Sequence, residues 1–214
     1  HDTNYSYVIA NSVKELDGLS EECIDRAAQL AASIGQKGKY AFNMQRTSCN
    51  PVLQYCNNRD LRRKVYEMYN NRANHDDEYD NKTVSREILQ LRLRKANIMG
   101  YRDYAAMQLE VKMAENAGNV YSLLDKIWGP AVAKANEELA DIKAMMKKDR
   151  IKGDPKPWDY MYYIEKGRKE KYDIDMELVS EYLDIDNVQK DGVFYVANKL
   201  YGLSFVERTE EYPQ

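Results

Sequence analysis

Histidine is the natural starting point in a search for catalytic chemistry, and this chain of 214 residues contains two. His1 is the first residue, and His75 lies in a polar stretch beside Asp76, Asp77 and Glu78. The sequence has no His-Glu-x-x-His pattern, which would place two imidazoles on one helix face as zinc ligands with the glutamate as general base. A metal bound by His75 is one interpretation. We favour an exposed loop histidine. The acidic cluster lacks the alternating oxygen ligands and central glycine of a calcium loop, so it is interpreted as an acidic segment leading into the next helix.

The sequence contains no motif for a catalytic nucleophile or for a phosphate-binding loop. The sequence has no Gly-x-Ser-x-Gly nucleophile elbow. The stretch Gly35-Gln36-Lys37-Gly38-Lys39 is rich in glycine and lysine, but it follows a predicted helix and precedes a predicted strand. A phosphate-binding loop needs the reverse order, strand then helix, so we predict a turn here. The sequence therefore predicts no catalytic, no cofactor-binding and no metal-binding residue in this chain.

The three cysteines are Cys23, Cys49 and Cys56. An odd number in a chain of ordinary length predicts reduced thiols in a reducing compartment. A Cys49–Cys56 disulfide is a less favoured alternative. A thiolate zinc site is less favoured still, because such sites show tight pairs of ligands.

Tyrosine is abundant, with eighteen residues in the chain. Residues 157–172 hold four of them together with Trp158. Helical geometry places Tyr160 and Tyr163 on one face, and Trp158 and Tyr162 on the neighbouring one. Tyrosine suits half-buried positions, with its ring inside and its hydroxyl at a polar partner. We favour a helix–helix interface, and the alternative is the wall of a groove that holds a peptide.

The elements that would position these side chains are mostly helical. A long helix with one apolar stripe is predicted from positions that recur at three- and four-residue steps. They are Val120, Leu124, Ile127, Ala131, Ala135, Leu139, Ile142 and Met146. Gly129-Pro130 would kink or restart this helix. The loop 152–157 separates it from the helix that carries Trp158.

Three further helices have clear signals. Residues 80–99 repeat apolar side chains at Val84, Ile88, Leu91 and Ile98 and end at Gly100. Another helix is capped by Asn58 and carries Leu61, Val65, Met68 and Tyr69 on one side. A third is capped by Ser20, with Leu19 packing on Ile24, and ends at Gly35 or Gly38.

Strand signals are few. Residues 5–9 and 40–44 are short, aromatic and β-branched, and are predicted to pair as a small antiparallel ribbon. Residues 203–206 are a third candidate strand. The predicted fold is mainly α, a multi-helix unit with a long central helix and at most this small ribbon. We expect residues 1–214 to form a single helical unit, with a division into 1–150 and 151–214 as the alternative.

The charge and hydropathy of the sequence limit the classes of partner that the chain is expected to bind. The net charge is −3 with acidic and basic residues mixed, so nothing favours nucleic acid or an anionic membrane. No apolar run approaches the roughly 20 residues that span a bilayer. The first residues do not have the layout of an export signal.

An ordered set of short motifs resembles the thimet-oligopeptidase-like family of zinc metallopeptidases, and most of all its bacterial peptidyl-dipeptidase branch. In the first half these are Asn58-Arg59-Asp60-Leu61-Arg62 with Tyr66 and Tyr69, Asp80-Asn81-Lys82, Leu91-Arg92-Leu93, Lys95-Ala96, Gly100-Tyr101, Tyr104-Ala105 and Lys112-Met113-Ala114. In the second half they are Pro157-Trp158-Asp159 with Tyr162-Tyr163, Lys171-Tyr172, and Leu200-Tyr201-Gly202-Leu203 with Phe205 and Glu207-Arg208. No single motif is decisive, but their order is specific and spans nearly the whole chain.

The resemblance implies a parent enzyme that binds zinc and cleaves short peptides in a deep helical channel, removing C-terminal dipeptides in the peptidyl-dipeptidase branch. Its zinc ligands belong to a C-terminal region that this chain does not include, so no catalytic or metal-binding role is transferred to any residue here. We therefore expect a helical, non-catalytic segment of such a peptidase, with zinc in the parent and none in this segment. The alternative is a free-standing helical module that binds peptide or protein through its aromatic surface.

The expected partners of the parent are short peptides, with no nucleic acid and no membrane. The expected compartment is the cytoplasm, or the periplasm if the parent carries an upstream signal peptide. A segment cut from a larger enzyme would expose apolar helix faces, so we also expect self-association at high concentration.

Overall fold

The computed structural model describes residues 6–172, 179 and 182–208. The chain divides between Gly167 and Arg168 into two compact units, which are described separately. The first unit contains β1 (Val8–Ala10), a 3-10 helix (Val13–Leu16), α2 (Glu21–Ser33), β2 (Tyr40–Phe42), α3 (Arg46–Tyr55), α4 (Arg59–Asn70), α5 (Lys82–Ile98), α6 (Tyr104–Leu109), α7 (Ala117–Lys148) and the start of α8 (Pro157–Tyr172). The second contains α10 (Ile185–Asn187), a π-helix (Val188–Phe194) and α11 (Tyr195–Tyr201).

The two strands form an antiparallel ribbon in which Val8 lies opposite Phe42 and Ala10 opposite Tyr40. This confirms the predicted ribbon, although each strand is only three residues long. Such a short ribbon needs helices behind it to be stable. Helix α2 packs on β2, and α4 packs on β1.

The predicted helix caps are confirmed. The Ser20 side chain accepts a hydrogen bond from the Cys23 amide at the start of α2. The Asn58 side chain accepts from the Asp60 and Leu61 amides at the start of α4. Each cap satisfies amide groups that have no partner within the helix.

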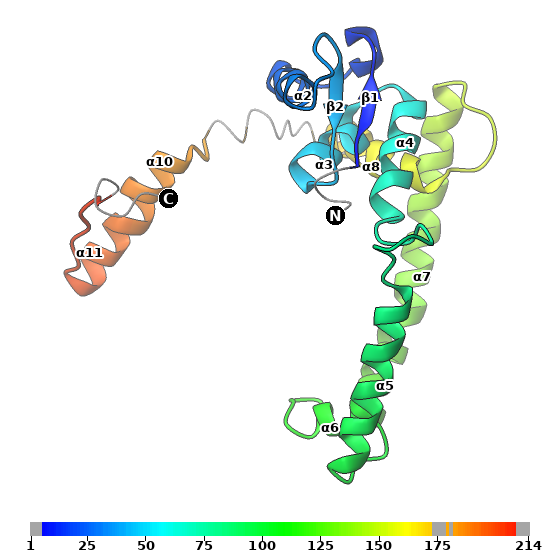
Figure 1. Ribbon diagram of the computed structural model, residues 1–214, viewed down its shortest axis with the longest axis vertical. Coiled ribbons are helices and arrows are strands. Elements are labelled where there is room, and N and C mark those ends of the chain that lie inside the picture. The colour runs from blue at the N-terminus through cyan, green and yellow to red at the C-terminus, as the bar shows by residue number, and fades with distance from the viewer. Residues whose placement is uncertain (1–5, 173–178, 180–181, 209–214) are drawn as a thin grey trace. The chain divides into compact units, whose positions relative to one another are not determined.

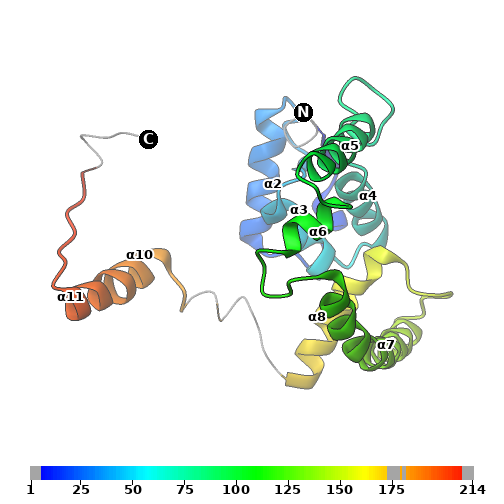
Figure 2. The ribbon, with the colours of Figure 1, turned by 90° about the horizontal axis from the view of Figure 1, so that it is seen from below.

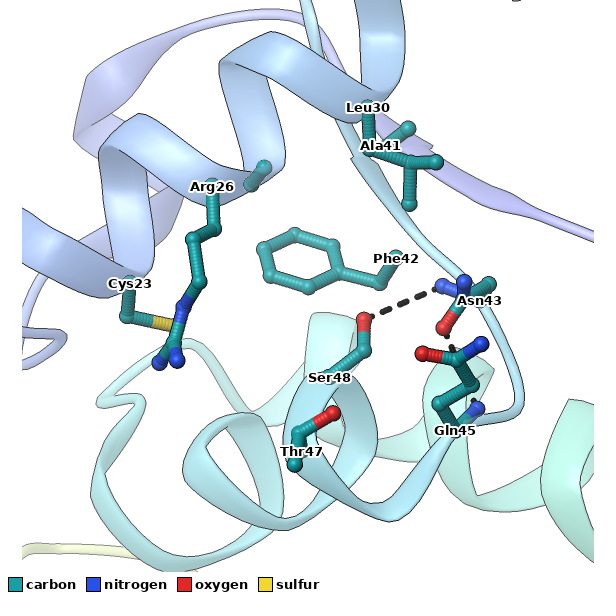
Figure 3. Close-up of a pocket in the computed structure, with 10 residues that line it drawn as sticks. Cys23, Arg26, Leu30, Ala41, Phe42, Asn43, Gln45, Thr47 and Ser48 are labelled. Atoms are coloured by element: carbon teal, nitrogen blue, oxygen red, sulfur yellow. Dashed lines mark hydrogen bonds between the residues drawn. The ribbon is translucent and has the colours of Figure 1, made fainter. Parts of the chain in front are cut away.

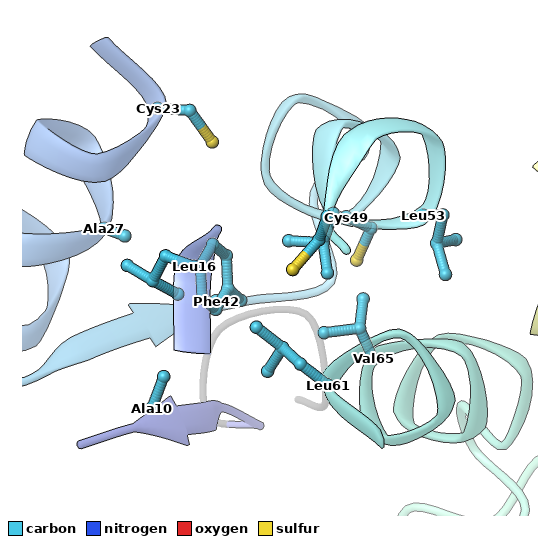
Figure 4. Packing of buried hydrophobic residues seen from close by; sticks show 11 residues of the cluster. Ala10, Leu16, Cys23, Ala27, Phe42, Cys49, Leu53, Leu61 and Val65 are labelled. Carbon is cyan, nitrogen blue, oxygen red and sulfur yellow. The ribbon is translucent and has the colours of Figure 1, made fainter. Parts of the chain in front are cut away.

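The larger hydrophobic core lies between the ribbon and helices α2, α3 and α4 (Figure 4). Its buried side chains come from every one of these elements. Burial of one large aliphatic or aromatic side chain stabilises a fold by about 1.5–3 kcal/mol. The members are Ala10, Leu16, Cys23, Ala27, Phe42, Cys49, Val52, Leu53, Cys56, Leu61 and Val65. All three cysteines are free thiols within this core, so the Cys49–Cys56 disulfide is not formed.

Helix α7 is a single helix of 32 residues that continues through Pro130 without restarting. Near its C-terminal end, Ile142, Met145 and Met146 pack against Tyr163 of α8 to form a second, smaller core. Every residue from 121 to 138 is exposed. The fully buried residues of this helix therefore lie near its C-terminal end.

Helix α5 spans 17 residues and ends just before Gly100, whose φ of 84° is the left-handed stop that the sequence predicted. Only Ala96 of this helix is buried. The short helix α6 contacts both α5 and α7 and follows α5 along the chain (Figure 1). Seen from below, α6 lies between α5 and α7 (Figure 2).

In the second unit, residues 203–206 do not form a strand, so that prediction was wrong. The described part of the second unit contains no strand with which they could pair, and a strand needs a partner to form a hydrogen-bonded ladder. Instead, Phe205 stacks on Phe194 with ring centroids 4.2 Å apart, and the Asn198 side-chain amide donates to the Leu203 carbonyl.

No helix in the described ranges is both long and apolar enough to cross a membrane.

Candidate functional site

Two aromatic residues of α8, Trp158 and Tyr162, contact α4 and the residue just before its cap. The Trp158 ring meets the Tyr66 ring of α4 edge-on at a centroid distance of 6.2 Å. The Tyr162 hydroxyl donates to the Asn57 side chain over 2.7 Å, and Tyr163 is fully buried. These contacts support the helix–helix interface, which was the favoured interpretation of this tyrosine-rich segment.

The centre of that interface is the carboxylate of Asp159, which is completely buried. It accepts two hydrogen bonds from Arg59, at 2.9 Å from Nε and 2.7 Å from Nη2. It also accepts from Arg62 Nη2 at 3.3 Å and from the Lys156 amide at 2.9 Å. The paired geometry with Arg59 is the strong, planar form of the carboxylate–guanidinium contact.

Arg62 is the second buried charge, with 1% of its surface exposed. Its Nη1 donates to the Cys56 carbonyl at 2.7 Å, and its Nε donates to the Trp158 carbonyl at 3.3 Å. Its guanidinium also lies over the Tyr162 ring, 4.0 Å from the centroid. A buried charge is tolerated only when it is paired and hydrogen-bonded, and this set of partners meets that requirement.

The electrostatics of Asp159 follow from these partners. Burial by itself raises the pKa of the carboxyl, but hydrogen bonds from Arg59 and the Lys156 amide outweigh it and hold the pKa below its usual range. The hydrogen bonds to Asp159 also raise the pKa of Arg59. Asp159 is thus a fixed anion at neutral pH, with four donors around it and no role as a proton carrier.

A second polar cluster joins α8 to the end of α7. The Tyr163 hydroxyl donates to Asp149 Oδ2 at 3.0 Å, and Lys166 Nζ donates to both oxygens of the same carboxylate at 2.8 and 2.7 Å. Burial, followed by the hydrogen bond to Asp149, raises the pKa of the Tyr163 hydroxyl. Tyr163 therefore stays protonated and acts as a hydrogen-bond donor.

A cavity of about 190 Å³ lies between α2, β2 and the start of α3 (Figure 3). Phe42 forms part of an apolar wall, while Arg26, Gln45 and Ser48 supply polar groups. Burial raises the pKa of the Cys23 thiol at this cavity, so it is not an activated nucleophile. The Ser48 hydroxyl accepts from the Asn43 amide, and no histidine lines the cavity. This cavity holds no catalytic set.

The side chains of the described residues do not fit a zinc site. No group of three or more histidine, cysteine or carboxylate side chains among them is placed to hold a metal ion. His75 is exposed, as the favoured interpretation had it, and His1 lies outside the described residues. Burial raises the pKa of the Cys49 thiol to about 11, and its Sγ donates to the Asn43 carbonyl, which disfavours the thiolate that zinc needs.

The buried Asp159–Arg59–Arg62 cluster was not recognised in the sequence, although all three residues belong to the motifs that carry the family resemblance. A partial signal exists: Arg59 and Arg62 are three residues apart, which places them on one face of α4. Their partner lies 100 and 97 residues further along the chain, and neither periodicity nor propensity encodes that pairing.

Comparison with known proteins assigns the family. The sequence profile of peptidase family M3 matches residues 52–213. The chain is 30% identical over 201 residues to dipeptidyl carboxypeptidase of Escherichia coli (strain K12), which covers 94% of this chain and 30% of that protein. It is 34% identical over 198 residues to oligopeptidase A of Haemophilus influenzae, covering 91% of this chain and 29% of that protein. It is also 34% identical over 205 residues to the probable cytosolic oligopeptidase A of Arabidopsis thaliana, covering 90% of this chain and 28% of that protein.

The chain spans about 30% of the length of these relatives. The matched region contains the Arg59, Arg62 and Asp159 cluster, and it begins after the cavity-lining residues of α2 and β2. The family resemblance that the ordered motifs suggested is confirmed: this chain belongs to peptidase family M3.

Proposed function

We propose that this chain is a helical, non-catalytic scaffold segment of a zinc-dependent oligopeptidase or peptidyl-dipeptidase that hydrolyses short peptides. The observation that carries the proposal is M3 membership combined with side chains that, across the described ranges, fit no zinc site. The chain covers only about 30% of relatives named for oligopeptidase and dipeptidyl carboxypeptidase activity. Zinc chemistry would then be supplied by the part of the peptidase that this chain does not span.

The buried polar clusters support a scaffold role. Asp159 and Arg62 have their hydrogen-bonding groups directed at each other and at the backbone, within the α4–α8 interface. Charged groups used in catalysis usually sit in a cleft where a substrate can reach them. Here they are sealed from solvent, and their role is to fix α8 on α4.

The expected compartment of the parent is the cytoplasm, and two features support it. One relative is named as cytosolic. In addition, the three buried cysteines are free thiols, as is usual in a reducing compartment. An export signal upstream of this sequence would place the parent in the periplasm instead.

The alternative, a free-standing module that binds peptide through its aromatic surface, loses its main motivation. Tyr163 is fully buried, and Trp158 and Tyr162 contact Tyr66 and Asn57 within the first unit. These rings therefore contribute to internal packing, and the scaffold function is the one we propose.

The experiment that tests the proposal is to sequence the gene downstream of the codon for Gln214 and to measure the zinc content of its full product. We expect an open frame that encodes His-Glu-x-x-His within the next few hundred codons, and one tightly bound zinc ion per protein. An open frame of that length without the motif, or a full product that binds no zinc, would overturn it.

A further inference from the structure

The apolar stripe of α7 is covered at one end and uncovered along the rest of its length. Ile142 and Met146 are buried against Tyr163 of α8. The same stripe continues towards the N-terminus through Leu124, Ile127 and Trp128, which are 45%, 52% and 71% exposed. Ile127 and Trp128 follow Leu124 by three and four positions, so all three lie on one surface of the helix.

Helix α5 also has an uncovered apolar face. Val84, Ile88 and Leu91 are 49%, 43% and 62% exposed and share one face. Most helical stability in proteins comes from packing of such a face and not from intrinsic propensity. Two long helices with uncovered apolar faces are thus incomplete as a folded unit within the described part of the chain.

The stripes differ from scattered surface hydrophobics. Single exposed apolar residues are normal, whereas contiguous patches mark surfaces that another body covers. The opposite face of α7 carries Lys126 and Glu137 among small residues, and Glu137 pairs with Lys134 at 3.0 Å. This division into an apolar and a solvated face is typical of a helix at the boundary of a larger core.

We infer that the exposed stripes of α5 and α7 form the docking surface for the part of the M3 polypeptide that this chain does not span. The length of the relatives argues for this occupant, since about 70% of each lies outside the match. Both helices also lie inside the region that matches the family profile. The inference rests on the proposed function, because it requires the natural gene product to be a longer M3 peptidase.

Hydrogen exchange of backbone amides tests the inference. The 214-residue chain, at low micromolar concentration, is compared with the full product of its gene, and exchange is followed in α7 from residue 121 to 138. We expect exchange to slow by about tenfold or more in the longer protein, because packing suppresses local opening. Helix α4, which is packed in both, serves as the internal reference and should exchange at the same rate.

Equal exchange of this α7 segment in the two proteins would overturn the inference. A second outcome would also overturn the inference. In it, the α7 segment is already protected in the 214-residue chain, the protection rises with the concentration of that chain, and it does not increase in the longer protein. The stripe would then be covered by a second copy of the chain. If the longer protein binds zinc and hydrolyses peptides but its α7 segment is not protected, this inference is contradicted while the proposed function stands. A gene product that is no M3 peptidase would overturn the proposed function as well.

A pair of variants on α7 separates docking from a general effect of added charge. Leu124→Glu places a carboxylate on the stripe, and Ala133→Glu places the same group on the opposite face by helical geometry. Both positions are exposed in the 214-residue chain. In that chain, both variants should therefore unfold at a temperature close to that of the unsubstituted 214-residue chain. In the longer protein, Leu124→Glu should remove the tenfold protection and Ala133→Glu should retain it. Equal loss, or equal retention, would contradict the assignment of this face.

Discussion

At the scale of single residues, the Asp159 carboxylate holds α8 on α4 through the guanidinium groups of Arg59 and Arg62. The amide of Lys156, the residue just before α8, donates a further hydrogen bond to the same carboxylate. A buried ion pair contributes little net stability compared with a well-packed apolar replacement. Removing one partner is different, because it leaves the opposite charge buried without compensation. Arg62, at 1% exposure, would be left in that state.

Asp159→Ala is therefore expected to lower the free energy of unfolding by about 3–5 kcal/mol, measured by urea denaturation at neutral pH. The matched control is Glu137→Gln, which removes a carboxylate from the exposed pair with Lys134 on α7. That variant should change the stability little, because exposed pairs are weak. Comparable losses in the two variants would contradict the role assigned to Asp159.

The lowered pKa of Asp159 also predicts a pH dependence. Since the folded-state pKa lies below the unfolded value of about 3.9, the carboxylate contributes stability above that value, and the contribution is lost as the pH falls through the folded pKa. The stability difference between the natural sequence and Asp159→Asn should be constant near neutral pH and shrink below about pH 4. Urea titrations across this range would measure it. A difference that stays unchanged in acid would show that folding does not lower the pKa of Asp159.

The sequence predicted the aromatic packing of α8 but not the charge pairing beneath it. Tyrosines at helical spacing are typical of a half-buried interface, and this pattern is local. The choice of Asp159 as partner for Arg59 and Arg62 depends on how two distant helices meet. Only the folded chain supplies that information.

At the scale of elements, helices α2, α4, α5 and α7 and the ribbon were predicted from the sequence. The signals that predicted them, such as helix caps and periodic apolar positions, are local, because each lies within a few residues of the next. Helix α3 was not predicted. Its sequence includes Pro51, which removes one backbone hydrogen bond and usually indicates the end of a helix. Burial of Cys49, Val52 and Leu53 in the core stabilises the helix in spite of the proline.

The turn at Gly18 gives a prediction for one connecting element. Its φ is 92°, and a Cβ there would lie 2.2 Å from the Tyr55 carbonyl oxygen. Gly18→Ala should therefore destabilise the protein by roughly 2–4 kcal/mol through backbone strain and the clash together. Gly38→Ala is the control, with a φ of 86° and nothing within 4 Å of the added Cβ, and should lose only about 1 kcal/mol. Thermal unfolding of both variants measures the difference, and equal losses would rule out the close approach to Tyr55.

At the scale of the whole molecule, the first unit combines a packed region with two long helices that have little core of their own. The buried residues gather around the ribbon, α2, α3 and α4, and around the junction of α7 and α8. The sequence predicted α5 and α7 as amphipathic helices, but it could not show whether their apolar faces are covered within this chain. Periodicity reports which face is apolar and gives no information about its partner.

These uncovered faces should make the 214-residue chain self-associate at high concentration. Trp128→Glu, at a side chain that is 71% exposed, should shift the association to higher concentration, while Ala133→Glu should not. Sedimentation velocity over a concentration series measures the effect. A monomer at every concentration up to the millimolar range would contradict the prediction.

We propose that this M3 chain is scaffold and that its catalytic chemistry belongs to a longer protein. Zinc-dependent hydrolysis of a short peptide, measured side by side for the purified 214-residue chain and for the full product of its gene, tests it most directly. We predict hydrolysis by the full product that a chelator abolishes and added zinc restores, and no hydrolysis by the 214-residue chain with zinc present. Zinc-dependent turnover by the 214-residue chain, or none by the full product, would contradict the claim.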